Sequence, residues 1–262
     1  MKQKTVAKTF SLSGIGIHSG TKTSMSVSPA LANSGIVFIK DNKQVPALAS
    51  QVKETRRGTC LDGIAVTEHF LAAAYALGLD NLLVEIKGDE LPIMDGSALP
   101  FVEAFEAAGI TELSADKGPL SIHQSIHLSS GDASLSIHPY HGFKVDFMVN
   151  FPVAGELRLS FDLNKGDFKK EIASARTFGY IEEYELLKEQ GLAQGASFEN
   201  ALVLGQDGYL NTPRFKDELV RHKVLDLIGD LALLGRPLEA EIKAVRSGHE
   251  LNIELVRRLS QK

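Results

Sequence analysis

Alternating hydrophobic and polar positions predict strands in both halves of the chain. Residues 143–151 carry Phe or Val at every second position, and residues 157–163 repeat the pattern with Leu and Phe. Because period-two alternation buries one face of a strand, these segments predict a hairpin with Gly155 in its connection. Weaker patterns predict a hairpin within residues 1–30, and further strands at 35–39, 81–87, 121–128, 133–138 and 239–245.

Helical patterns lie between these strands. One predicted helix opens at residues 67–69 and is stopped by Gly78, and others cover residues 100–108 and 180–190. A further helix runs through residues 221–230, with Thr212 and Pro213 as its expected N-cap and first residue. A last helix follows Ser247, for which a capping box with Glu250 is expected.

The order of these elements repeats. A helix that opens on a histidine, a glycine, a strand and a second helix follow one another in each half of the chain. This repeat predicts an α+β fold that arose by internal duplication, with the helical layers of the two halves facing each other. The polar stretch at residues 111–120 is the predicted linker, so we expect domains at 1–114 and 119–262.

Composition excludes several classes of function. The chain has 262 residues, a net charge of −5 and no basic block, which argues against a nucleic-acid partner. A single cysteine excludes an internal disulfide and a zinc site built from cysteines. The first residues have no continuous apolar core, and the longest apolar run, residues 70–79, is too short to span a bilayer. We therefore expect a cytoplasmic protein without a stable membrane anchor.

The helix through residues 221–230 carries an unusual polar stripe. His222, Asp226 and Asp230 recur at intervals of four, so they share one helical face, yet apolar residues flank them. Burying unpaired carboxylates is costly, and a metal ion or a second histidine would neutralise them. The simpler alternative is a buried His–Asp hydrogen bond, which this stretch alone favours.

The repeat supplies a partner for the stripe, because His69 opens the matching helix of the first half. Two imidazoles and one carboxylate, such as His69, His222 and Asp226, form the ligand pattern of catalytic zinc sites. Glu68 could then serve as a general base, although a solvated acid in the first helical turn is equally expected.

His249 lies in the first turn of the last helix, and pairing with Asp230 would make it a general acid. Exposure to water is an equally simple interpretation of His249 alone. Four further histidines are expected to have no role in the site: His123, His127, His138 and His141.

Six motifs occur in an order that resembles one enzyme family. They are GIGIHSG (14–20), TEH (67–69), PIMDGSALPF (92–101), SARTFGY (174–180), RHKVLDLIGD (221–230) and SGHELN (247–252). They resemble the UDP-3-O-acyl-N-acetylglucosamine deacetylases (LpxC) of lipid A biosynthesis. The resemblance implies two β-α-α-β sandwich domains with the site between them, each with a small insert, at about 41–62 and about 180–210. The second insert would form an acyl-chain passage.

The resemblance also implies an activity and a role for each matching residue. The enzyme would be a monomeric, metal-dependent amidohydrolase that removes the N-acetyl group from a UDP-linked acylated amino sugar, giving acetate and the free amine. Its metal would be Zn²⁺, with Fe²⁺ as an alternative. The implied roles are as follows: metal ligands His69, His222 and Asp226; general base Glu68; general acid His249, supported by Asp230; oxyanion stabiliser Thr177; and substrate contacts Lys223, Phe178, Asp95 and His18.

Two other functions stay open at this point. One is a metal-dependent deacetylase of another N-acetyl amino sugar. The other is a non-catalytic nucleotide-lipid binding module, which has no need of Glu68, His249 and Asp230 together. The sequence also leaves open whether Glu68 alone performs both proton transfers.

Overall fold

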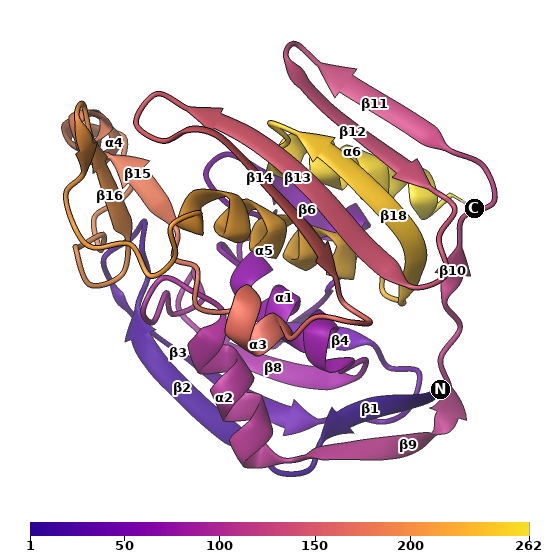
Figure 1. Ribbon diagram of the computed structural model, residues 1–262. Coiled ribbons are helices and arrows are strands. Elements are labelled where there is room, and N and C mark those ends of the chain that lie inside the picture. Colours follow the sequence, from indigo (N-terminus) through magenta and orange to yellow (C-terminus); the bar gives the residue numbers. More distant parts are fainter. Residues whose placement is uncertain (262) are drawn as a thin grey trace.

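The computed structural model describes residues 1–261 and contains two α+β halves that meet along a layer of helices (Figure 1). Each half is built on one main sheet. The first sheet has the order β2 (Phe10–Ile15), β3 (Lys22–Pro29), β8 (Leu82–Lys87), β4 (Ile36–Lys40), β5 (Lys43–Pro46). The second has the order β11 (Ile126–Ser130), β12 (Ala133–His138), β18 (Leu238–Val245), β13 (Phe143–Phe151), β14 (Gly155–Asp162), and β10 (Leu120–Ser121) also pairs with β18.

The two sheets have the same topology. The central strand β8 is parallel to β4 and antiparallel to β3, and β18 is likewise parallel to β13 and antiparallel to β12. Each central strand lies between two helices along the chain. These are α1 (Glu68–Leu77) and α2 (Leu99–Ala108) in the first half, and α5 (Glu218–Ala232) and α6 (His249–Leu259) in the second. The predicted duplication is therefore confirmed.

The strongest predicted hairpin is also confirmed. β13 and β14 pair antiparallel from Lys144 with Asp162 to Phe151 with Gly155. Phe143, Val145 and Phe147 are buried, as the alternation requires. These side chains join the core beneath α5.

Helices α1 and α5 make the most extensive contact between the halves. Buried residues of both helices belong to one hydrophobic core that also contains residues of both main sheets. Gly229 makes the close crossing possible, because a Cβ atom there would lie 2.1 Å from the carbonyl oxygen of Glu68. The crossing brings the first turn of α1 against the polar stripe of α5.

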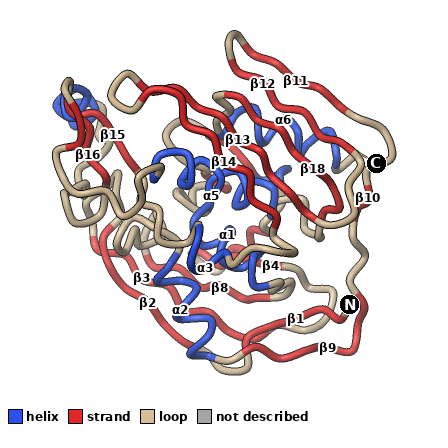
Figure 2. Tube along the Cα trace, viewed as in Figure 1, coloured by secondary structure: helices blue, strands red, loops and turns tan. Residues whose placement is uncertain are grey.

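Each half carries an insert, which lies between β5 and α1 in the first half and between β14 and α5 in the second (Figure 2). The first insert contains η1 (Ala49–Gln51), β6 (Val52–Glu54) and β7 (Cys60–Leu61). The second contains β15 (Phe178–Tyr180), η2 (Ile181–Glu183), α4 (Tyr184–Glu189), β16 (Leu202–Gly205) and β17 (Gly208–Tyr209), close to the predicted range of about 180–210. α3 (Phe168–Glu171) lies in the connection from β14 to this insert.

The predicted linker at residues 111–120 is a strand over most of its length. β9 (Ile110–Asp116) pairs antiparallel with β1 (Lys2–Val6) and forms a two-stranded ribbon. Every side chain of β9 is exposed or half-buried, so the strand carries no apolar pattern. Main-chain hydrogen bonds to β1 hold it in place.

Two predicted helix starts are also wrong. α5 begins at Glu218, and Thr212 lies in a loop where its carbonyl oxygen accepts a hydrogen bond from Arg176. α6 begins at His249 without a side-chain cap. The Ser247 hydroxyl donates instead to the Asn252 side chain, 2.7 Å away, so the expected capping box does not form.

Two segments are shorter than predicted. The helix expected at 180–190 is a strand end at Tyr180, a turn of 3₁₀-helix and then α4. The irregular region expected at 41–62 begins later, because β5 pairs with β4 inside the main sheet.

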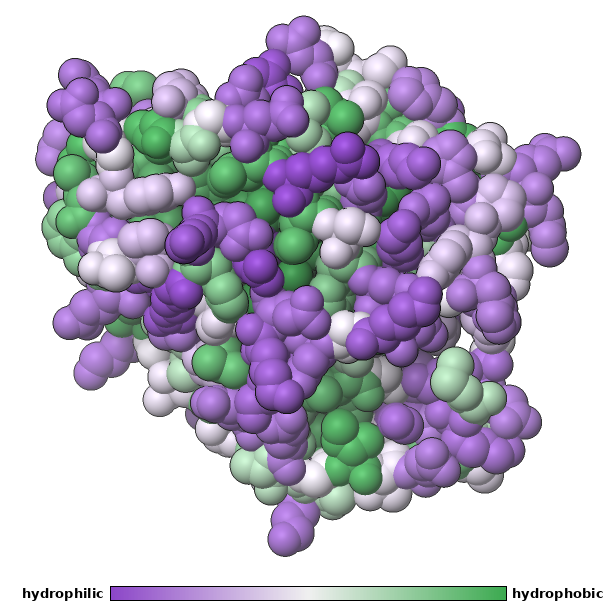
Figure 3. Space-filling model, viewed as in Figure 1, coloured by the Kyte–Doolittle hydropathy of each residue, from purple (hydrophilic) through white to green (hydrophobic). Residues whose placement is uncertain are grey.

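Hydrophilic side chains cover most of the face drawn in Figure 3, and apolar ones gather over the second insert and the nearby end of α5. Within residues 1–261, no helix is both long enough and apolar enough to cross a membrane.

Candidate active site

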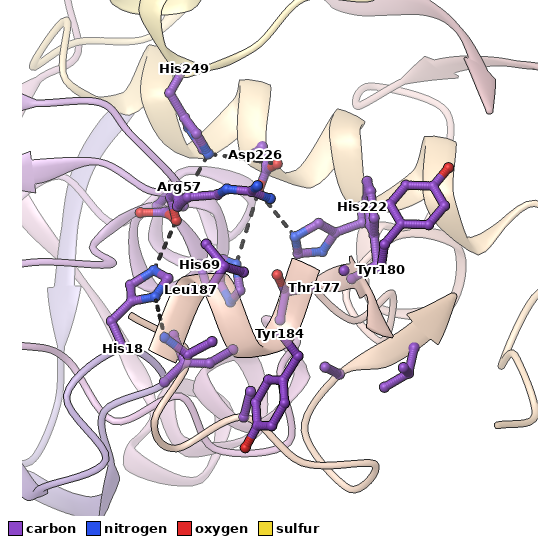
Figure 4. Close-up of a pocket in the computed structure, with 18 of the residues that line it drawn as sticks. His18, Arg57, His69, Thr177, Tyr180, Tyr184, Leu187, His222, Asp226 and His249 are labelled. Carbon is purple, nitrogen blue, oxygen red and sulfur yellow. Dashed lines mark hydrogen bonds and ion pairs between the residues drawn. The ribbon is translucent and has the colours of Figure 1, made fainter. Parts of the chain in front are cut away.

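Three potential metal ligands converge where α1 crosses α5. α1 contributes His69, while α5 contributes His222 and Asp226, which lie one turn apart. His222 Nε2 lies 3.2 Å and His69 Nε2 lies 3.9 Å from Asp226 Oδ1, and one potential ligand atom from each residue lies within 4.8 Å of the others. Figure 4 shows that both imidazoles point toward Asp226. All three residues are about as buried as core residues, at 3% exposure.

The contacts around these side chains fit a divalent cation. His222 donates its Nδ1 proton to the carbonyl oxygen of Ala175 at 3.1 Å, which leaves the Nε2 lone pair facing the centre. Asp226 Oδ1 is buried and accepts no hydrogen bond. An anionic oxygen without a donor is unfavourable in a protein interior, and a cation between Asp226 and the imidazoles would remove that cost.

The protonation states of these side chains also favour metal binding. Burial, helped by the neighbouring His222, lowers the pKa of His69 to about 3, so its imidazole is neutral. Burial also lowers the pKa of His222. For Asp226 burial acts in the opposite direction, but His222 and Lys223 hold its pKa well below the usual range. Neutral imidazoles and an ionised carboxylate are the forms that bind metals.

Lys223 is tied to the same centre. Its Nζ lies 2.7 Å from Asp226 Oδ2, so it contacts the carboxylate oxygen that faces away from His222. This pair leaves Oδ1 as the oxygen without a partner. Lys223 is mostly buried, and part of it lines the cavity described below.

Glu68 and His249 form a second pair beside the first. Glu68 Oε1 lies 3.9 Å from His249 Nε2, and Glu68 Oε2 accepts a hydrogen bond from the main-chain N–H of Thr59 at 3.0 Å. Burial, with the nearby carboxylates of Asp226 and Asp230, raises the pKa of Glu68 to about 7. Such a carboxyl group can both accept and release a proton near neutral pH.

His249 has the opposite charge preference. Although its burial disfavours the charged form, the carboxylates of Asp230 and Asp226 raise the pKa of His249 to about 9. Its Nδ1 donates to Asp230 Oδ2 at 2.8 Å, which turns Nε2 toward Glu68. A protonated imidazole therefore faces a carboxyl group with a pKa near neutrality, which is an arrangement suited to acid–base chemistry.

These groups form one end of a cavity of about 620 Å³. Its other end is predominantly apolar and is built mainly by the second insert. The lining residues there include Tyr180, Ile181, Tyr184, Leu187, Ala193, Phe198 and Val203. A cavity with a charged end and an apolar end suits a molecule with a polar head and a long apolar chain.

Most of the residues predicted for the site line this cavity. Thr177 does so, with its side-chain oxygen directed into the space between the two imidazoles of His69 and His222 (Figure 4). Phe178 packs edge-on against His222, with ring centroids 5.9 Å apart. Asp230 does not line the cavity, and its carboxylate contacts His249 instead.

His18 and Asp95 make contacts of a different kind. His18 lines the cavity, and its ring bridges the inserts, with Nε2 3.0 Å from the carbonyl oxygen of Arg57 and Nδ1 accepting from Ala193 N–H at 3.4 Å. Asp95 is not among the lining residues. Its carboxylate accepts from Ser97 and pairs with Arg214 at 2.7 Å.

Two buried residues of the site were not expected from the sequence. The Thr59 hydroxyl donates to Asp230 Oδ1 at 2.5 Å, and the Asn252 side chain donates to Asp230 Oδ2 at 2.8 Å. Asn252 lies three residues after His249 on one helical face, a spacing that could have suggested it. Nothing in the pattern around Thr59 indicates a role, because its position depends on folding of the first insert.

Known proteins match this chain over almost its whole length. The family model described as UDP-3-O-acyl N-acetylglycosamine deacetylase (LpxC) matches residues 3–261. A UDP-3-O-acyl-N-acetylglucosamine deacetylase of Myxococcus xanthus is 42% identical over 98% of this chain and 86% of its own length. Proteins with the same name from Coxiella burnetii and Pasteurella multocida are each 40% identical, over 99% and 98% of this chain and 90% and 89% of their own lengths.

Proposed function

This chain belongs to the UDP-3-O-acyl-N-acetylglucosamine deacetylase (LpxC) family, and on that premise we propose that it hydrolyses the N-acetyl amide of a UDP-linked, 3-O-acylated N-acetylglucosamine. The products are acetate and the free amine, and the reaction belongs to lipid A biosynthesis. The observation that carries the proposal is the convergence of His69, His222 and Asp226, from both halves, beside Glu68 and His249.

The proposed metal is Zn²⁺, held by His69, His222 and Asp226. The unpartnered Asp226 Oδ1 and the free Nε2 lone pair of His222 support this ligand set, which would also accept Fe²⁺. When bound, the ion supplies Lewis acidity, which polarises the acetamide carbonyl and makes water more acidic.

Glu68 is the proposed general base. It takes a proton from the water molecule that attacks the carbonyl carbon of the acetamide. Its pKa of about 7 supports this role, because a base is most effective when its pKa is close to the working pH. Thr59 N–H holds one carboxylate oxygen, so the other is left to face the reaction.

His249 is the proposed general acid. Its Nδ1 is engaged by Asp230, so the Nε2 proton is the one that can be given to the departing amine as the C–N bond breaks. The same positive charge stabilises the developing oxyanion, with the Thr177 hydroxyl as a second donor. Glu68 still holds the proton that it took from water. Transfer of this proton to His249 returns both residues to their starting protonation states.

The cavity supports the substrate class. Its apolar end, built by the second insert, is proposed to hold the acyl chain. Lys223 is proposed to offer positive charge to the diphosphate, and Phe178 and His18 to contact other parts of the substrate, whereas Asp95 lies outside the cavity and pairs with Arg214. The proposal also includes a monomeric, cytoplasmic enzyme without a nucleic-acid partner, in keeping with a net charge of −5.

A comparison of two substrates tests this function. Acetate release should be rapid with the 3-O-acylated UDP-N-acetylglucosamine, and at least about 100-fold slower in kcat/KM with UDP-N-acetylglucosamine, because binding of the acyl chain helps to position the amide. Equal rates would favour a deacetylase of another N-acetyl amino sugar. Tight binding of both compounds without acetate release would favour a binding module.

A further inference from the structure

Thr59 lies in the first insert, immediately before β7. It is completely buried, and both its side chain and its main chain contact the groups that carry the proposed chemistry. Those groups come from three different helices. Glu68 belongs to α1, Asp230 to α5 and His249 to α6.

The hydroxyl of Thr59 holds Asp230. It donates to Asp230 Oδ1 at 2.5 Å, and its oxygen also lies 3.3 Å from His249 Nδ1. The other carboxylate oxygen, Oδ2, accepts from both His249 and Asn252. Among the described residues, Thr59 is therefore the one side-chain donor to Oδ1, and it fixes the plane in which Asp230 meets the imidazole.

The main chain of Thr59 holds Glu68. Its N–H donates to Glu68 Oε2 at 3.0 Å, and its carbonyl oxygen accepts from Thr67 N–H and the Thr67 hydroxyl at 3.3 and 3.2 Å. Gly58 completes this geometry with φ +153°. A Cβ atom there would lie 3.0 Å from Glu68 Oε1, the oxygen that faces His249.

We propose that Thr59 is a positioning residue that couples the general base to the general acid across the two halves of the molecule. Its N–H sets one carboxylate oxygen of Glu68, and its hydroxyl sets Asp230 and through it His249. Their 3.9 Å separation thus depends on one residue of the first insert. The inference rests on the proposed function, since it assigns Thr59 a part in that reaction.

Replacement of the hydroxyl tests the coupling. Thr59→Val keeps the side-chain shape and the N–H donor to Glu68, but leaves Asp230 Oδ1 without a donor. We expect kcat of the zinc-loaded enzyme to fall about 10- to 100-fold, with KM and zinc content within about twofold of wild type. Thr59→Ser, which restores the hydroxyl, should return kcat to within about threefold of wild type.

A threonine remote from the site provides the matched control. Thr5 is also buried, and its hydroxyl bridges Asn81 and Ala30. Thr5→Val should lower the melting temperature through the loss of buried hydrogen bonds, while kcat stays unchanged. A merely structural role for Thr59 would instead give Thr59→Val a lower melting temperature and the kcat of wild type, which overturns the proposal.

Further outcomes keep the test decisive. Loss of zinc together with kcat in Thr59→Val, or a Thr59→Ser variant as slow as Thr59→Val, also overturns the coupling. If Thr59→Val does not fold, Thr59→Cys replaces it, and its weak thiol donor should give an intermediate kcat, whereas the kcat of wild type contradicts the proposal. Absence of deacetylation by the wild-type enzyme would mark a failure of the proposed function itself.

Discussion

At the residue scale, the proposed chemistry depends on Glu68 and His249, which are both buried beside the same carboxylates. These carboxylates disfavour the charged form of Glu68 and favour the charged form of His249. Glu68 lies near the carboxylates of Asp226 and Asp230, and its burial and their charge both favour the protonated acid. The same carboxylates stabilise the charged form of His249 strongly enough to outweigh its burial. A base with a pKa of about 7 therefore faces an acid with a pKa of about 9, and the same neighbours produce both values.

Removal of the charge on Glu68 should separate metal binding from catalysis. Glu68→Gln keeps a side-chain oxygen that can accept from Thr59 N–H, but it cannot take a proton. We expect bound zinc and melting temperature close to wild type, and a loss of about 10²- to 10⁴-fold in kcat. Metal analysis and acetate release measured on one preparation check this, and near-normal turnover would remove Glu68 from the role of base.

The site was only partly predictable from residue patterns. The stripe of His222 and Asp226 alone favoured an ordinary buried hydrogen bond, and the internal repeat was needed to suggest His69. The contact itself depends on long-range packing of α1 on α5, which no local pattern reports. Thr59 could not be found at all, because only the folded insert brings it to Asp230 and Glu68.

At the scale of elements, the crossing of α1 and α5 determines the site. Gly229 lets the two helices approach until the main chain of Glu68 lies against α5. This contact fixes how far His69 stands from His222, whose ring centroid lies 5.0 Å away. The separation of the ligands is thus set by a residue without a side chain.

A methyl group at this crossing should lower the stability of the protein. Gly229→Ala places a Cβ atom against the main chain at Glu68, so the helices must move apart. Overpacking of this kind typically lowers the free energy of unfolding by about 1–3 kcal/mol. Urea denaturation checks the loss, with Gly118→Ala as control, because a Cβ atom at Gly118 meets nothing within 4 Å. Equal stabilities of the two variants would refute this account of the crossing.

Elements with one buried face were predicted well. Elements held by main-chain pairing or by contacts within the folded site were not. The Phe and Val alternation of β13 follows directly from burial of one face. β9 carries no such signal, because its pairing with β1 leaves most of its side chains in water. The start of α6 was misjudged because Ser247 is engaged by Asn252, and that contact is made by the folded site.

At the scale of the whole molecule, the two halves share one core and one set of proposed metal ligands. The buried cluster includes residues of both sheets and of both central helices, so neither half buries its helical layer alone. The domain limits of 1–114 and 119–262 therefore remain a prediction of where the two repeated halves meet. They do not imply that either half folds alone. The proposed ligands His69 and His222 come from different halves, so metal binding would depend on the stability of both.

Unfolding should therefore be one cooperative event that responds to metal. Far-UV circular dichroism and tyrosine fluorescence should give coincident urea transitions. Zinc at 100 times its dissociation constant should add about 3 kcal/mol to the free energy of unfolding. His222→Ala should abolish this gain, and two separate transitions, or a zinc response confined to one of them, would contradict a shared core.

The most direct test of the account measures acetate release from the 3-O-acylated UDP-N-acetylglucosamine before and after the metal is removed. We predict one acetate per free amine formed, loss of turnover after treatment with a chelator, and recovery after stoichiometric Zn²⁺ is added back. Deacetylation that continues at the full rate in protein shown to be free of metal would contradict the account, because His69, His222 and Asp226 would then have no part in the reaction.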